Sequence, residues 1–204
     1  EYWQPVWLLT WLPAWWLLAL VMVVGFPGNA RLWHHTPVLA LAGYLLLVPS
    51  WAAVVQVQQA GAVGLGGPWA LLFILVWVWA ADTGAYFAGR AFGRHKLAPS
   101  VSPGKTIEGL LGGLVLALAV AALVAWWQPI AGDRLMLMLV AGVTVLASVL
   151  GDLFESMIKR QTGIKDSGRM LPGHGGMLDR IDSVTAALPV AVMTLAGAGL
   201  PGAI

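Results

Sequence analysis

The stretch that decides the fold is LMLMLVAGVTVLASVLGDLFESMIKR, residues 135–160. It opens with an apolar run that holds no charged residue before Asp152. A helix needs about 20 mainly apolar residues to cross the roughly 30 Å hydrocarbon core of a bilayer. Acids and bases follow the run at helical spacing. The segment therefore predicts a membrane-spanning helix whose last turns carry acidic and basic side chains.

Five other stretches are nearly as long and as apolar. The six predicted spans are 6–24, 38–57, 68–87, 106–127, 135–154 and 184–200. Hydrophobic residues make up 59% of the 204 residues and charged residues only 10%, against about 25% charged residues in soluble domains. This composition excludes a soluble domain, a disordered chain and a coiled coil, and the lack of cysteine excludes a disulfide scaffold. We expect an all-α, polytopic integral membrane protein of about six transmembrane helices.

The basic residues alternate between the loops that join these spans. The loops 26–37, 88–105 and 159–180, with their flanks, hold ten of the eleven lysines and arginines. Basic loops favour the cytoplasmic side, so we expect these three loops there, together with a polar site. The net charge of +2 is too small to suggest a nucleic-acid partner.

Acidic residues lie where a membrane makes them costly. Asp82 follows a 14-residue apolar run, and Asp152 precedes the next basic residue by seven positions. A carboxylate at mid-bilayer costs about 2.5–3.5 kcal/mol on insertion scales. Such acids face a wet cavity, a cation or a basic partner, so we interpret both as site residues. A structural ion pair is the alternative.

Two helical segments repeat one arrangement of polar residues. Spacings of i, i+3 and i+4 place side chains on one helix face. The two sets are Asp152, Glu155, Ser156 and Lys159, and then Asp179, Asp182 and Ser183. The loop between them is rich in glycine and in charged residues. Carboxylates beside lysines and arginines suit Mg²⁺ with phosphate, and the few histidines argue against zinc.

The segment 102–106 reads Ser-Pro-Gly-Lys-Thr and is followed by Glu108. It resembles the end of a Walker A loop, but that pattern needs glycine where this chain has Pro99. We expect either a phosphate site on a helix N-terminus, with Lys105 as point charge, or a simple helix cap with Glu108 in the first turn.

The segment from Ser156 to Asp182 resembles the signature of the phosphatidate cytidylyltransferases, or CDP-diacylglycerol synthases. It reads Ser-x-Ile-Lys-Arg at 156–160, Lys-Asp-x-Gly at 165–168, and Leu-Pro-x-His-Gly-Gly-Met-x-Asp-Arg-Ile-Asp at 171–182. The segments 82–109 and 151–156 are similar to the same family. The resemblance covers residue 68 to the C-terminus.

The resemblance implies a reaction in which CTP and phosphatidate give CDP-diacylglycerol and diphosphate. It implies Mg²⁺ on Asp152 and Asp179, a second, monovalent cation such as K⁺, a homodimer, and a multi-pass protein of the inner (cytoplasmic) membrane. The chain then divides into N-terminal transmembrane helices, 1–67, and a catalytic region, 68–204. Since the first residue is Glu1 and family members are longer, we expect an N-terminal part to be missing.

The sequence and the resemblance together nominate site residues. The candidate catalytic residues are Asp152, Asp179, Lys159, Arg160, Lys165, Asp166, His174, Arg180 and Asp182. The candidate substrate-binding residues are Ser102, Lys105, Thr106, Glu108, Ser156, Gly175, Gly176 and Asp82. We interpret His174 as a phosphate hydrogen-bond donor, with acid–base catalysis as the lesser option.

Two other functions share some of these features. Another CTP-dependent lipid kinase or cytidylyltransferase would use similar cations and phosphate-binding groups, but should not fill the whole 156–182 pattern. A cation-coupled transporter would place its acids near the bilayer midplane and show repeated halves. Here the acids cluster at one boundary and the chain shows no internal repeat.

Overall fold

The computed structural model describes residues 11–62, 64–127, 133–164, 166–168 and 176–198. These residues form helices joined by short connections and one β-hairpin. The elements are α2 (Leu12–Gly25), the 3₁₀ turn η1 (Ala30–Leu32), α3 (Thr36–Ala60), α4 (Gly67–Phe92), β1 (Lys96–Ala98), β2 (Ser102–Thr106), α5 (Ile107–Trp127), α6 (Arg134–Thr162) and α7 (Leu178–Gly197). The predicted all-α class is confirmed, and the hairpin is an addition that the apolar pattern did not indicate.

Five helices, α3 to α7, are long and apolar enough to cross a membrane. α2 is apolar but has 14 residues within the described part of the chain, and the start of the predicted span 6–24 lies outside it. The other five predicted spans each coincide with a helix. The predicted membrane-protein class is therefore confirmed.

The helices extend further into the polar loops than the sequence suggested. α4 continues to Phe92, α6 continues to Thr162, and α7 begins at Leu178, so the loops predicted at 88–105 and 159–180 are shorter. Charge favours this extension, because Lys159 and Arg160 lie in the last turn of α6 and Asp179 in the first turn of α7. α6 ends where Gly163 adopts the left-handed conformation, at φ 71°.

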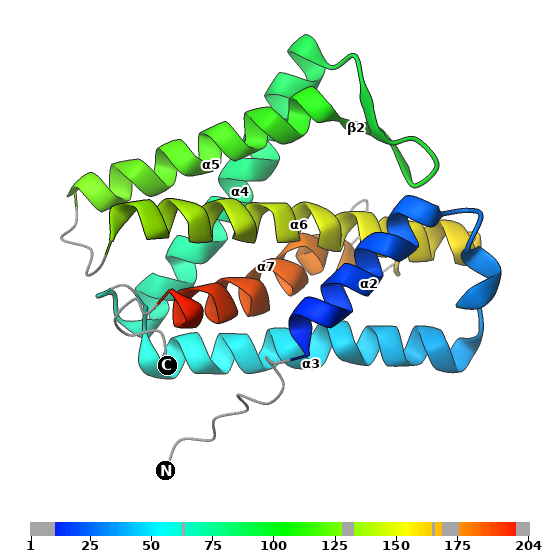
Figure 1. Ribbon diagram of the computed structural model, residues 1–204, viewed down its shortest axis with the longest axis horizontal. Helices are drawn as coiled ribbons and strands as arrows, with labels where there is room; N and C mark the ends of the chain where they lie inside the picture. Colours follow the sequence, from blue (N-terminus) through cyan, green and yellow to red (C-terminus); the bar gives the residue numbers. More distant parts are fainter. Residues whose placement is uncertain (1–10, 63, 128–132, 165, 169–175, 199–204) are drawn as a thin grey trace.

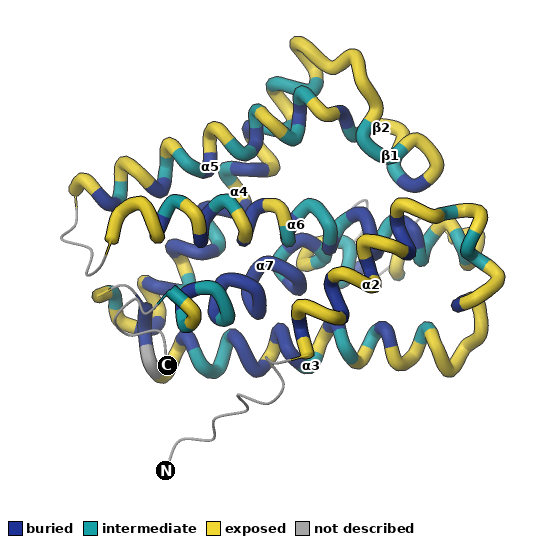
Figure 2. The backbone as a smooth tube through the Cα atoms, viewed as in Figure 1, coloured by how far each residue is buried: buried dark blue, intermediate teal, exposed yellow. Residues whose placement is uncertain are grey.

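α7 forms the centre of the bundle and lies between α3 and α6 (Figures 1 and 2). Pro189 interrupts its backbone hydrogen bonds, because proline has no N–H to donate to the carbonyl of Thr185. The hydroxyl of Ser50 on α3 lies 2.5 Å from that carbonyl oxygen. A side chain of the neighbouring helix thus satisfies a backbone group that lipid could not.

α4 and α5 pack closely through glycines. A Cβ atom added to Gly84 would lie 2.6 Å from the carbonyl oxygen of Gly112, and one added to Gly113 would lie 2.5 Å from that of Ala81. Small residues let membrane helices approach to backbone contact. The hairpin connects the end of α4 to the start of α5, so the packing of these two helices fixes where the hairpin begins and ends.

The hairpin and two connections meet at one end of the bundle (Figure 1). The hydroxyl of Ser100 donates to the carbonyl of Phe26 at 3.0 Å, and the Arg160 side chain donates to the carbonyl of Val101 at 3.3 Å. Gln161 donates to the carbonyl of Ala30 at 3.4 Å. The loops grouped by their basic residues therefore lie side by side.

The glycine contact gives a stability test. Gly113→Ala should destabilise the protein by about 1–3 kcal/mol, the usual cost of overpacking, because its Cβ meets backbone rather than a flexible side chain. Gly142→Ala is the control, since its Cβ would meet only a Leu114 methyl group at 3.9 Å. Thermal unfolding in detergent measures both, and equal midpoints for the two variants would contradict the packing argument.

Candidate active site

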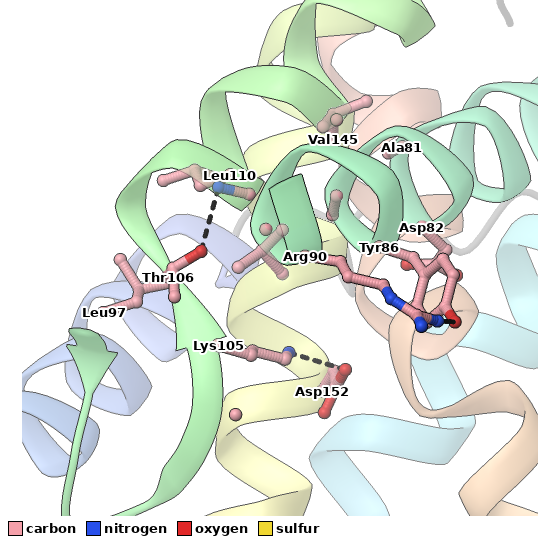
Figure 3. Close-up of a pocket in the computed structure, with 16 residues that line it drawn as sticks. Ala81, Asp82, Tyr86, Arg90, Leu97, Lys105, Thr106, Leu110, Val145 and Asp152 are labelled. Carbon is pink, nitrogen blue, oxygen red and sulfur yellow. Dashed lines mark hydrogen bonds and ion pairs between the residues drawn. The ribbon is translucent and has the colours of Figure 1, made fainter. Parts of the chain in front are cut away.

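An ion pair joins the hairpin to the bundle. The Lys105 ammonium on β2 lies 2.5 Å from the carboxylate of Asp152 on α6, and both side chains are about one quarter exposed (Figure 3). The other carboxylate oxygen of Asp152 accepts a hydrogen bond from the Ser156 hydroxyl at 3.3 Å. Asp152 and Ser156 thus share a helix face, as their spacing predicted.

Two further carboxylates surround this pair. Asp82 on α4 and Asp182 on α7 each interact electrostatically with both Asp152 and Lys105. Three helices therefore each bring one aspartate within electrostatic range of Lys105, and only Asp152 contacts it directly. Within the described residues, Asp82 has no direct hydrogen bond or ion pair, and it lines the pocket described below.

A second charged cluster lies one helical turn along α6. The Lys159 ammonium is 2.6 Å from Glu155 and 2.8 Å from Asp179. The Asp179 carboxylate also accepts the backbone N–H groups of Ser167 and Gly176, at 3.0 Å and 2.7 Å. Asp179 therefore joins the start of α7 to the segment 166–168 and to the end of α6.

Asp182 connects the two clusters. It interacts electrostatically with Lys105 in the first cluster and with Lys159 in the second. The acids that were predicted from two helices are thus brought into one continuous charged region. Each of its two lysines could exchange its carboxylate partner for a phosphate, because a phosphate carries more negative charge than a carboxylate.

Glu108 holds the hairpin in place. Its carboxylate accepts the backbone N–H groups of Arg94 and His95 at 3.1 Å and 3.2 Å, and lies 2.6 Å from His95 Nδ1. Glu108 was predicted to bind substrate or to serve a helix N-terminus. The structure gives it a positioning contact with residues 94 and 95, which connect α4 to the first strand of the hairpin; Lys105 lies on the second strand.

Thr106 caps α5, because its hydroxyl accepts the N–H of Gly109 at 3.1 Å. The segment 102–106 was expected to form either a phosphate site or a helix cap, and the structure assigns these roles to different residues. Thr106 serves the cap, whereas Lys105 points to Asp152 and remains a candidate for phosphate (Figure 3). The segment itself is a strand, with Ser102 opposite Ala98.

A pocket of about 580 Å³ opens between the hairpin, α4, α5 and α6 (Figure 3). Its charged lining comes from Asp82, Arg90, Lys105 and Asp152. The rest is mainly glycine and aliphatic side chains of the three helices. The pocket therefore combines charged groups with an apolar lining.

The remaining predicted residues have different positions. Arg160 contacts the hairpin at Val101, Asp166 is exposed, and Gly176 is buried. Arg180 is exposed on α7. Lys165, His174 and Gly175 lie outside the described residues, so their predicted roles remain predictions.

Sequence reasoning did not nominate Arg90 or Glu155 for the site. Arg90 lines the pocket, and its guanidinium donates to the Tyr86 hydroxyl at 2.9 Å. Arg90 lies eight residues, or about two helical turns, after Asp82. This spacing could have indicated that Arg90 shares the side of the helix that carries Asp82. Glu155 was noticed only as part of the polar face of α6.

The aspartates of the charged region, Asp82, Asp152, Asp179 and Asp182, provide carboxylate oxygens, the ligands that Mg²⁺ prefers. In the described part of the chain, no group of three or more acidic or histidine side chains is close enough to form a metal site. The two predicted ligands instead each contact a lysine. Carboxylates that share a region with displaceable ammonium groups are chemically suited to a hard cation.

Comparison with known proteins decides the family. Residues 3–197 match the model of the cytidylyltransferase family. The chain belongs to this family. It is 46% identical over 183 residues to the phosphatidate cytidylyltransferase of Haemophilus influenzae. The aligned residues make up 86% of this chain and 64% of that protein.

Two other relatives give the same result. The phosphatidate cytidylyltransferase of Pseudomonas aeruginosa is 47% identical over 191 residues, 92% of this chain and 69% of that protein. The phosphatidate cytidylyltransferase of Staphylococcus haemolyticus is 48% identical over 120 residues, 59% of this chain and 46% of that protein. The family resemblance read from the sequence is confirmed, and the chain spans only part of each relative.

The Glu108 contact gives a local test. Glu108→Gln should loosen the hairpin, because a neutral amide accepts more weakly from two N–H groups and loses its attraction to His95. Amide hydrogen exchange across residues 94–106 should then become faster. Asp133→Asn, which alters the cap at the opposite end of α6, is the control and should leave hairpin exchange unchanged. Equal exchange in the parent and in Glu108→Gln would contradict the positioning role.

Proposed function

We propose that this cytidylyltransferase converts CTP and phosphatidate to CDP-diacylglycerol and diphosphate. The observation that carries the proposal is the 580 Å³ pocket, whose charged end holds Lys105 and Arg90 and whose other end is apolar. A lipid with a phosphate head group matches both ends. The names of the relatives supply the reaction.

The chemistry suits the residues. An oxygen of the phosphatidate phosphate attacks the α-phosphorus of CTP, a new P–O bond forms, and the bond to the β-phosphate oxygen breaks. Diphosphate leaves with the bonding pair. A phosphate monoester has a second pKa of about 6 and is largely dianionic at neutral pH, so the nucleophile needs no strong general base.

The main task of the protein is to hold two polyanions together, since positioning and charge dominate such transfers. In this proposal Lys105 and Arg90 hold the phosphate of the lipid. Lys159, next to the segment 166–168, faces the phosphates of the nucleotide. Both lysines exchange a carboxylate partner for a phosphate when substrate binds.

Asp152 and Asp179 would hold Mg²⁺, with Asp82 and Asp182 nearby as further carboxylates. The ion would neutralise charge on the nucleotide phosphates and on the departing diphosphate. We further propose that the charged end of the bundle faces the cytoplasm in the inner membrane, which brings a soluble nucleotide to a lipid of the bilayer. The monovalent cation and the homodimer are also part of this proposal.

Purified protein in mixed micelles, given phosphatidate and each of the four nucleoside triphosphates with Mg²⁺, tests the proposal. Formation of CDP-diacylglycerol with release of one diphosphate is the expected result. Product should not form without Mg²⁺ or phosphatidate. Release of a nucleoside diphosphate together with a diphosphorylated lipid would instead indicate a lipid kinase.

The predicted metal ligands give a quantitative test. Asp152→Asn and Asp179→Asn should each lower kcat by about a hundredfold or more, since each 1.36 kcal/mol of lost transition-state stabilisation is a factor of ten. Their double variant should be little worse, because residues that act as a unit are not additive. Asp133→Asn, at the opposite end of α6, should retain parental turnover. Folded Asn variants with parental turnover at low Mg²⁺ would contradict the metal assignment.

A further inference from the structure

The first two turns of α7 carry two acids of the charged region, Asp179 and Asp182. The rest of α7 does not fix their position, because Pro189 interrupts the helix after them. A proline inside a helix removes one backbone hydrogen bond, and its ring presses on the carbonyl four residues earlier, so the helix can bend there. Contacts with other helices must therefore hold the half of α7 that carries the acids.

The neighbouring helix α3 supplies one of these contacts, through Ser50 (Figure 1). The Ser50 hydroxyl lies 2.5 Å from the carbonyl oxygen of Thr185, the group that Pro189 deprives of its helical N–H donor. The same hydroxyl lies 2.5 Å from the carbonyl oxygen of Leu46 on its own helix. In an α-helix that carbonyl already accepts the N–H of residue 50, so the hydroxyl proton is needed at Thr185. Both residues are buried, and an unpaired carbonyl there would be costly.

Thr185 also contacts the turn that carries Asp182. The Thr185 hydroxyl donates to the carbonyl of Asp182 at 2.7 Å. That carbonyl lies against α6, because a Cβ atom added to Gly151 would come within 2.8 Å of its oxygen. The Asp182 carboxylate interacts electrostatically with Asp152, the residue after Gly151. The turn that Ser50 holds is therefore packed directly against the charged region.

Asp179, one turn earlier on α7, belongs to the nucleotide side of the proposed site. It lies 2.8 Å from the Lys159 ammonium, the group proposed to face the nucleotide phosphates. A second pocket, of about 240 Å³, adjoins Lys159 between α3, the end of α6 and the start of α7. Lys105 and Arg90, proposed to hold the lipid phosphate, lie on β2 and α4 instead. A shift of the start of α7 away from α3 would therefore disturb the nucleotide side first.

We propose that Ser50 is a positioning residue for the reaction, a role that rests on the proposed function. Its hydrogen bond to the Thr185 carbonyl fixes the first turns of α7. Those turns then hold Asp179 and Asp182 in the places that nucleotide binding requires. Ser50 precedes residue 68, where the resemblance to the family begins, so the N-terminal helices contribute to the site through this contact.

The test compares the steady-state kinetics of Ser50→Ala with those of the parent in mixed micelles. KM for CTP should rise at least about threefold and kcat/KM for CTP should fall about tenfold, because misplacement by about an ångström can cost up to about a hundredfold. KM for phosphatidate should stay within about twofold of the parental value, since Lys105 and Arg90 keep their places. A loss of folded protein would lower kcat alone, so unchanged KM values would overturn the proposal.

A second background, Pro189→Ala, tests the mechanism of the effect. Alanine at this position restores an N–H to the Thr185 carbonyl, so the Ser50 hydroxyl is no longer needed there. Ser50→Ala should lower kcat/KM for CTP about tenfold in the parent but less than about twofold in Pro189→Ala, because both changes act on one carbonyl. Equal losses in the two backgrounds would overturn the proposal.

The matched control is Thr194→Val. The Thr194 hydroxyl donates to the Val190 carbonyl at 2.7 Å, within α7 itself and beyond Pro189. This variant removes a hydroxyl from the same helix but leaves the contact between α3 and α7 intact, so kcat and both KM values should stay parental. A rise in KM for CTP equal to that in Ser50→Ala would contradict a role specific to Ser50.

Amide hydrogen exchange in detergent gives a measurement that needs no turnover. Residues 178–186 should exchange faster in Ser50→Ala than in the parent, because the start of α7 loses its contact with α3. Unchanged exchange there would overturn the positioning role. A parent protein that forms no CDP-diacylglycerol would contradict the proposed function, whereas the exchange of residues 178–186 would still decide whether Ser50 holds the start of α7.

Discussion

The ion pair between Lys105 and Asp152 is the interaction on which the charged region depends. It joins a strand outside the spanning helices to the face of α6 that carries the acids. The hairpin can reach α6 because α4 and α5 meet through glycines and because Glu108 fixes the turn at 94–95. The pair is partly exposed and holds the hairpin against α6, so the fold and the charge pattern support each other.

Each of the two pockets has a lysine and an acidic residue in its lining. The first lies against Lys105 and Asp152 and extends toward aliphatic side chains. The second lies against Lys159 and Glu155, and Asp182 interacts with both clusters. In the proposed reaction between a membrane lipid and a soluble nucleotide, the charged groups between the two pockets would hold the phosphates of both substrates.

The sequence predicted the helices well, because long apolar runs leave few alternatives in a membrane, and five of the spans coincide with helices. It also grouped Asp152 with Ser156 correctly from helical spacing. It did not predict the hairpin, since three- and five-residue strands carry little periodic signal. The pairing of Lys105 with Asp152 and the pocket around Glu155 depend on contacts between distant segments, which spacing along one helix cannot reveal.

A double-mutant cycle on Lys105 and Asp152 tests the central claim most directly. Lys105→Met and Asp152→Asn would be assayed alone and together for kcat/KM with CTP and phosphatidate, with thermal unfolding measured in parallel. We predict that each change lowers kcat/KM by about a hundredfold, and that the pair together is little worse than either alone. Losses that multiply to about ten-thousandfold would show that the two residues act independently, and would contradict a shared site.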